Sequence, residues 1–91
     1  MALQIINAGP DPGEIAGKIR EAIAIAIDGA RIEVEARGPG HFEVSVVSEI
    51  FEGKSQVQQH QLVYGAITEL MSGPQAPVHA IDRLQCRTQD S

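Results

Sequence analysis

Three histidines and one cysteine are the residues of this 91-residue chain best suited to metal binding or proton transfer. His41, His60 and His79 are evenly spaced, but their flanking residues differ, so the spacing indicates no repeat. No two of them form an HxH or an i, i+4 pair, and the sequence therefore gives little support for a zinc site built from this chain alone. A lone histidine is usually a hydrogen-bonded structural residue, and that interpretation stays open for each of the three.

Cys86 has no basic or histidine neighbour in sequence that would lower the pKa of its thiol, which predicts an inert strand cysteine. Because it is the only cysteine, no internal disulfide is possible, and we expect a reducing cytosol. The sequence contains no CxxC, Walker loop, GxSxG or GxGxxG motif. Without a nucleophile, base and orienting residue that form a unit, the sequence predicts a binding domain and not an enzyme.

The charge of the chain argues against nucleic acid or a membrane as its main partner. Twelve acidic residues face seven basic ones, for a formal charge of −5. Binding to phosphates draws its affinity from Lys and Arg, and binding to a membrane surface is disfavoured for the same reason.

The first residues, MALQIINAGP, lack the basic and apolar segments of a signal peptide. The largely aliphatic composition predicts one small core.

A first helix is predicted to begin at Asp11, an N-cap followed by Pro12, and to stop at Gly29. Its apolar residues recur three and four positions apart, which is typical of a helix with one buried face. The residues of that face are Ile15, Ile19, Ala22, Ile23, Ala26 and Ile27.

A second, long helix is predicted from Ser55, whose capping box would include Gln58, to the neighbourhood of Gly73. Its apolar side is predicted to comprise Val57, Tyr64, Ile67, Leu70 and Met71. The preceding loop allows two interpretations, a capped helix start or a phosphate nest around Gly53 and Lys54, and the capped start is favoured.

Three strands complete the pattern. Residues 31–37 alternate strictly between apolar and polar residues, and residues 41–47 alternate again with Phe42, Val44 and Val46 facing inward. The tight Gly38-Pro39-Gly40 connection between them predicts a hairpin. The irregular segment 48–54 is anchored by Phe51. A last strand is predicted from about Val78 to Arg87, and its broken alternation over residues 81–86 indicates a bulge. The acidic residues Glu33, Glu35, Asp82 and Asp90 are predicted to be solvated surface.

The order helix, strand, strand, helix, strand predicts one α+β domain over residues 1–91, with a three-stranded sheet and both helices on one face. Residues 1–10 are predicted either to fray or to add a strand to a sheet edge, and residues 88–91 to form a tail. The residues predicted to be buried together are Ile19, Ile23, Val34, Phe42, Val44, Val46, Ile67 and Leu70.

A series of motifs with fixed spacing fills the centre of the chain. They are His41-Phe42, Val46-Val47-Ser48, Phe51-Glu52-Gly53-Lys54-Ser55, Val57, His60, Val63-Tyr64 and Val78-His79-Ala80. In this order they resemble the core pattern of the BolA family. With the first helix and the hairpin, the resemblance covers roughly residues 12–81.

The resemblance implies a KH-like fold and a protein that is not an enzyme. BolA-like proteins pair with monothiol glutaredoxins, and the pair can share a two-iron two-sulfur cluster whose thiolates come from the glutaredoxin and a glutathione. The histidine of the V-H-A motif, here His79, is then the cluster ligand of this chain. A second family ligand is a His or Cys in the loop between the first two strands. The loop from Arg37 to Gly40 has neither, so the role of second cluster ligand would fall to His41 at the edge of this loop.

By the same resemblance, we expect His60, Lys54 and Ser55 to bind the partner, and the isolated chain to hold no cofactor. The leading hypothesis is an adaptor for a monothiol glutaredoxin in iron–sulfur trafficking or iron sensing. The alternative is a KH-like, DNA-binding transcription regulator, which the acidic charge and the missing second glycine after Gly53 disfavour. A third hypothesis is a structural domain whose histidines have no special role.

Overall fold

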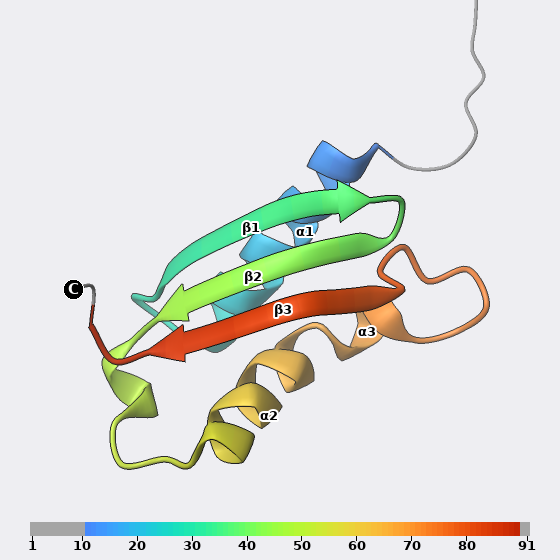
Figure 1. Ribbon diagram of the computed structural model, residues 1–91. Helices are drawn as coiled ribbons and strands as arrows, with labels where there is room; N and C mark the ends of the chain where they lie inside the picture. The colour runs from blue at the N-terminus through green and yellow to red at the C-terminus, as the bar shows by residue number, and fades with distance from the viewer. Residues whose placement is uncertain (1–10, 90–91) are drawn as a thin grey trace, which may run out of the picture.

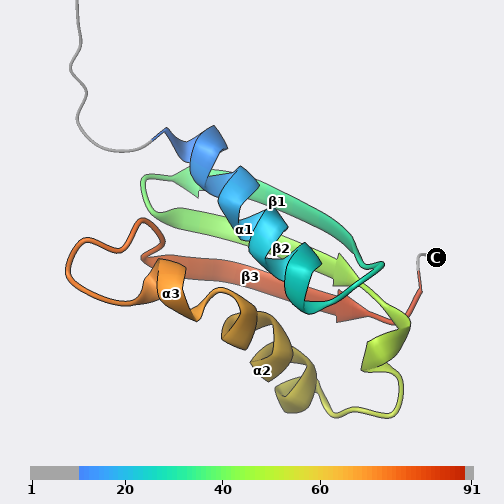
Figure 2. The same ribbon diagram turned by 180° about the vertical axis from the view of Figure 1, so that it is seen from behind.

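The computed structural model describes residues 11–89, which form a three-stranded sheet with helices on one face (Figures 1 and 2). The elements are α1 (Pro12–Ala26), β1 (Arg31–Gly38), β2 (His41–Val47), η1 (Glu49–Phe51), α2 (Gln56–Ala66), α3 (Thr68–Met71) and β3 (Ala80–Arg87). The sheet order is β1-β2-β3, with β1 antiparallel and β3 parallel to β2. The predicted α+β class and element order are confirmed. The two alternatives for residues 1–10 lie outside the described residues.

Helix α1 begins as predicted. The backbone N–H of Gly13 donates to the Asp11 carboxylate at 3.2 Å, and Pro12 occupies the first helical position. Ile15, Ala16, Ile19 and Ile23 form its buried face. The prediction that Ala26 is buried is wrong, because the chain leaves helical geometry at the next residue and the Ile27 side chain fills the core at that end.

The predicted long second helix is divided at Ile67 into α2 and the short α3. Its capping box is confirmed, but its predicted apolar side is wrong at two residues. Val57 and Tyr64 are 65% and 37% exposed, whereas Val63 and Ile67 are buried. Ile67 was predicted correctly, whereas Val63, the residue before Tyr64, is buried in place of Tyr64. No helix within residues 11–89 has the length and apolar content that crossing a bilayer requires.

The sheet turns the predicted residues toward the helices. Phe42, Val44 and Val46 of β2 are buried, and the charged residues of β1 lie on the open face, so the predicted register is confirmed. Val34 and Leu70, which were predicted to be buried, are only partly so, because Val34 lies on an edge strand and Leu70 in the short α3. Phe51 anchors the connection after β2 and is completely buried.

A bulge in β3 changes the face of the sheet on which its later side chains lie. Phe42 pairs with Ile81, but the next residue of β2, Glu43, pairs with Arg83, so Asp82 is the extra residue. The register shift turns Leu84 and Cys86 toward the helices. Without it, Arg83 and Gln85 would face the apolar core instead. The predicted bulge is therefore confirmed, and its physical cause is the burial of the apolar residues that follow it.

Two isoleucines of α1 test this arrangement. Ile23 is 0% exposed and Ile25 is 79% exposed on the same helix. We expect Ile23→Ala to lower the free energy of unfolding by about 2 to 5 kcal/mol through lost burial and a cavity. The matched change Ile25→Ala should stay within about 0.5 kcal/mol of the parent. Chemical denaturation measures both, and equal effects would contradict the assigned helix face.

Candidate functional site

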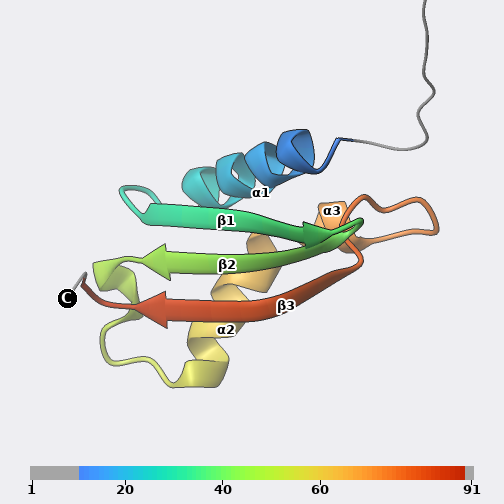
Figure 3. The same ribbon diagram turned by 45° about the horizontal axis from the view of Figure 1, so that its top comes forward.

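The starts of β2 and β3 meet at one end of the sheet, beside α3 (Figure 3). His41 is the first residue of β2, and its parallel partner in β3 is Ala80, the residue that follows His79. The fold therefore brings together the two histidines that the sequence marked as metal ligands. We call this region the histidine end and define it by Gly40, His41, His79 and Asp82.

His79 is exposed immediately before β3. The preceding residue, Val78, is buried, and its N–H donates to the Leu70 carbonyl at 3.1 Å. Because this N–H binds α3 and not β2, β3 begins at Ala80 and not at the predicted Val78. Val78 therefore anchors the segment, and His79 lies at the surface. The His79 ring makes no hydrogen bond to any residue within the described part of the chain.

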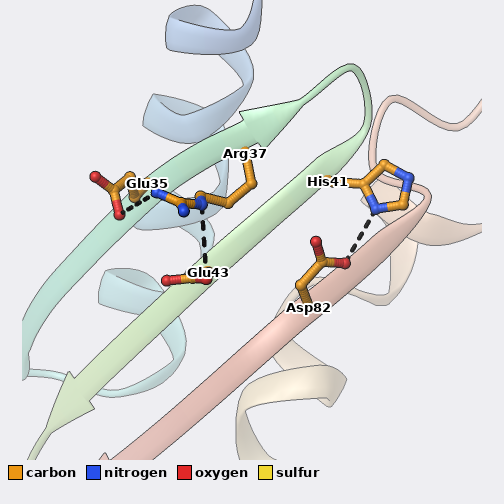
Figure 4. Close-up of polar contacts among 5 residues, drawn as sticks. All are labelled: Glu35, Arg37, His41, Glu43 and Asp82. Carbon is orange, nitrogen blue, oxygen red and sulfur yellow. Dashed lines mark hydrogen bonds and ion pairs between the residues drawn. The ribbon is translucent and has the colours of Figure 1, made fainter.

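His41 has a partner that the sequence did not predict. Its Nδ1 lies 3.0 Å from Oδ1 of Asp82 (Figure 4), and both side chains are about half exposed. A carboxylate only accepts hydrogen bonds, so Nδ1 carries the proton and donates it. Nε2 is then the nitrogen left to accept a hydrogen bond or bind a metal. Asp82, predicted to be solvated surface, is partly exposed but acts as the hydrogen-bond partner of His41.

Charges on the open sheet face are balanced in pairs. Glu35 and Glu43 lie directly opposite each other on β1 and β2, an arrangement that is repulsive by itself. Arg37 lies between them, 3.3 Å from the Glu35 carboxylate and 3.6 Å from that of Glu43 (Figure 4). Such exposed pairs add little stability, but they leave this part of the face without an excess of positive charge.

The other predicted partner-binding residues lie away from the histidine end. Lys54 and Ser55 precede α2, beyond the opposite end of β2 (Figure 1). The Ser55 hydroxyl accepts from the N–H of Gln58 at 3.2 Å, and the Ser55 N–H donates to the Gln58 side chain at 3.0 Å. The favoured interpretation of a capped helix start is confirmed.

His60 lies on α2 and lines a hollow of about 440 Å³ together with Cys86 of β3. Burial raises the pKa of the Cys86 thiol to about 11, because water is partly withdrawn from the thiolate. The group is therefore a neutral thiol near pH 7, which agrees with the inert cysteine predicted from its neighbours. This hollow has no activated nucleophile.

Metal binding at the histidine end would need ligands from elsewhere. Within residues 11–89, no three His, Cys, Asp or Glu side chains are grouped so that they could hold a metal ion. His41 and His79 offer two imidazoles, each with a ring nitrogen that no described residue occupies. These two groups could complete the coordination of a metal centre presented by another molecule.

Comparison with known proteins gives a family. The family model described as BolA-like protein matches residues 21–91. BolA-like protein 1 of Homo sapiens is 41% identical over 85 residues, an alignment that covers 88% of this chain and 59% of the relative. The chain thus spans about three fifths of the length of this curated relative.

Solved structures share the fold. The solution structure of the BolA1 protein from Mus musculus has a TM-score of 0.66 and 32% identity, over 93% of this chain and 72% of that one. The BolA domain of SufE1 from Arabidopsis thaliana has a TM-score of 0.71 and 28% identity, over 84% of this chain and 93% of that one. The arrangement of helices and strands described above is therefore that of known BolA domains.

The hydrogen bond between Asp82 and His41 predicts a tautomer. In the parent protein at a pH where His41 is neutral, ring ¹⁵N shifts should show the proton on Nδ1. In Asp82→Ala this preference should be lost, while the free energy of unfolding changes by less than about 1 kcal/mol, as for an exposed pair. The exposed change Asp28→Ala serves as the control and should leave the His41 shifts unchanged. An unaltered tautomer in Asp82→Ala would contradict the assigned contact.

Proposed function

Because this chain belongs to the BolA-like protein family, we propose that it is an adaptor that binds a monothiol glutaredoxin and contributes imidazole to a shared two-iron two-sulfur cluster. The observation that carries the proposal is the placement of His79. It is the histidine of the Val78-His79-Ala80 motif, its backbone is held on both sides, and its ring is exposed without a hydrogen-bond partner among the described residues. An exposed imidazole on a fixed backbone suits ligation of a metal centre carried by a partner.

The donor set fits such a cluster. Imidazole can replace thiolate on one iron, as it does in Rieske centres. The remaining ligands would be thiolates from the glutaredoxin and its glutathione. When bound, the cluster supplies the iron that the imidazole ligates, whereas this chain supplies the direction and protonation state of that imidazole. A neutral imidazole is required, so ligation should weaken on acidification.

His41 is the proposed second ligand. The turn at Pro39-Gly40 contains neither the His nor the Cys that the family places between its first two strands. His41 follows this turn directly, and its hydrogen bond to Asp82 leaves Nε2 free. A carboxylate on the other ring nitrogen is the usual arrangement for a metal-binding histidine, because it fixes the tautomer and raises the basicity of the ligand.

Lys54 and His60 remain proposed partner contacts, in a region separate from the histidine end. Ser55 would act there indirectly, through the helix start that it caps. Helix α2 contains no Lys or Arg and exposes Val57 and part of Tyr64, so its outer surface suits a protein more than a nucleic acid. A role in iron–sulfur trafficking or iron sensing follows from the proposed cluster.

Replacing His79 should separate function from folding. We expect the parent to change the visible absorption and circular dichroism of a cluster-loaded monothiol glutaredoxin, and His79→Ala to abolish that change. The free energy of unfolding should move by no more than about 0.5 kcal/mol, because the side chain is exposed. Gln75→Ala, an exposed change in the same segment, is the matched control and should behave like the parent. A folded His79→Ala that still alters the spectrum would show that His79 is not a ligand.

The adaptor hypothesis also predicts weak nucleic-acid binding. The formal charge is −5, and helix α2 has no Lys or Arg. At physiological salt, the dissociation constant for a defined DNA duplex should be micromolar or weaker, because few phosphates can be neutralised. Fluorescence anisotropy over a salt series measures it. A nanomolar constant at that salt would instead favour the transcription regulator.

A further inference from the structure

We infer that Gly40 is the positioning residue of His79, because the absent side chain of Gly40 leaves the space that the imidazole occupies. The contact itself is independent of what His79 binds. Its importance for cluster ligation rests on the function proposed above.

Gly40 holds the backbone on both sides of the His79 peptide. The carbonyl of Gly40 accepts hydrogen bonds from the N–H of His79 at 2.8 Å and from that of Ala80 at 3.0 Å. One peptide group of the β1–β2 turn therefore fixes the start of β3. With Val78 buried and bonded to Leu70, the His79 backbone has little freedom to move away from the turn.

The imidazole lies directly against the Gly40 backbone. A Cβ atom at position 40 would lie 2.7 Å from both Cγ and Nδ1 of His79, and 3.1 Å from its Cβ. Favourable contacts between carbon atoms begin at about 3.5 Å. Any side chain at position 40 must therefore rotate the ring or separate the turn from β3. Either change alters the direction in which His79 presents its nitrogens.

Preorganisation is the functional consequence. A ligand that already points toward its metal loses less conformational freedom on binding than one that rotates freely. The short turn that deprives this chain of a loop ligand also places a residue without a side chain beside His79. This turn therefore has no ligand of its own, but it orients the proposed ligand His79.

Gly29 provides a matched control for backbone strain. Gly40 has a φ of +77° and Gly29 a φ of +79°, both in the region that favours glycine. A Cβ at Gly29 would meet no atom within 4 Å. Alanine at position 29 therefore introduces the backbone strain alone, whereas alanine at position 40 introduces the strain and the collision with His79.

The experiment compares these variants in two backgrounds. Gly40→Ala should lower the midpoint of thermal unfolding more than Gly29→Ala does. In a His79→Ala background, most of this excess loss should disappear, because the two closest atoms are gone. If Gly40→Ala alone fails to fold, the double variant should fold, and that rescue supports the same conclusion. Equal losses for the two glycines in both backgrounds would overturn the inference.

Ring NMR signals and cluster spectra complete the test. The His79 ring signals should shift in Gly40→Ala and stay in place in Gly29→Ala, and unchanged signals in Gly40→Ala would overturn the inference. With cluster-loaded glutaredoxin, Gly40→Ala should weaken the apparent affinity at least about tenfold while Gly29→Ala retains it. Retained affinity in a Gly40→Ala variant with shifted signals would overturn the functional role. A parent protein without any cluster response would contradict the proposed function, while the coupling between Gly40 and His79 could still hold.

Discussion

The parallel pairing of β2 with β3 is the interaction on which the histidine end depends. It places residues that are far apart in sequence at the same end of the sheet, and its register is set by burial. The extra residue Asp82 allows Leu84 and Cys86 to face the helices while Arg83 stays in water. Because Asp82 remains on the open face, its carboxylate reaches His41. The bulge that burial of Leu84 and Cys86 requires therefore also provides His41 with its hydrogen-bond partner.

The buried core and the proposed functional residues occupy different parts of the molecule. Over residues 11–89, the core is built from aliphatic side chains and two phenylalanines, with no polar side chain among its buried members. The polar contacts of the open face are exposed and contribute little to stability. Substitutions at His41, His79 or Asp82 should therefore leave the fold intact, whereas Gly40 links the two parts because its backbone supports both the turn and β3.

The two ring environments at the histidine end differ in kind. His41 is fixed by a hydrogen bond to a side chain, which selects its tautomer. His79 is fixed by the backbone and by contact with a glycine, which leaves both ring nitrogens without a hydrogen bond among the described residues. A partner that presents a metal would therefore meet two oriented imidazoles: His41, whose tautomer leaves Nε2 available, and His79, whose tautomer no described residue selects.

Local features of the sequence determined the helix starts, the hairpin and the presence of a bulge, because capping, alternation and its interruption act between residues close in the chain. They did not determine which stripe of α2 is buried, since four glutamines weaken its periodicity and the division at Ile67 depends on packing. The motif resemblance identified His79 and His41 as candidate cluster ligands. Only the tertiary structure placed Asp82 beside His41 and Gly40 against the His79 ring. Both contacts join segments about forty residues apart in sequence, which the parallel register of β2 and β3 brings together.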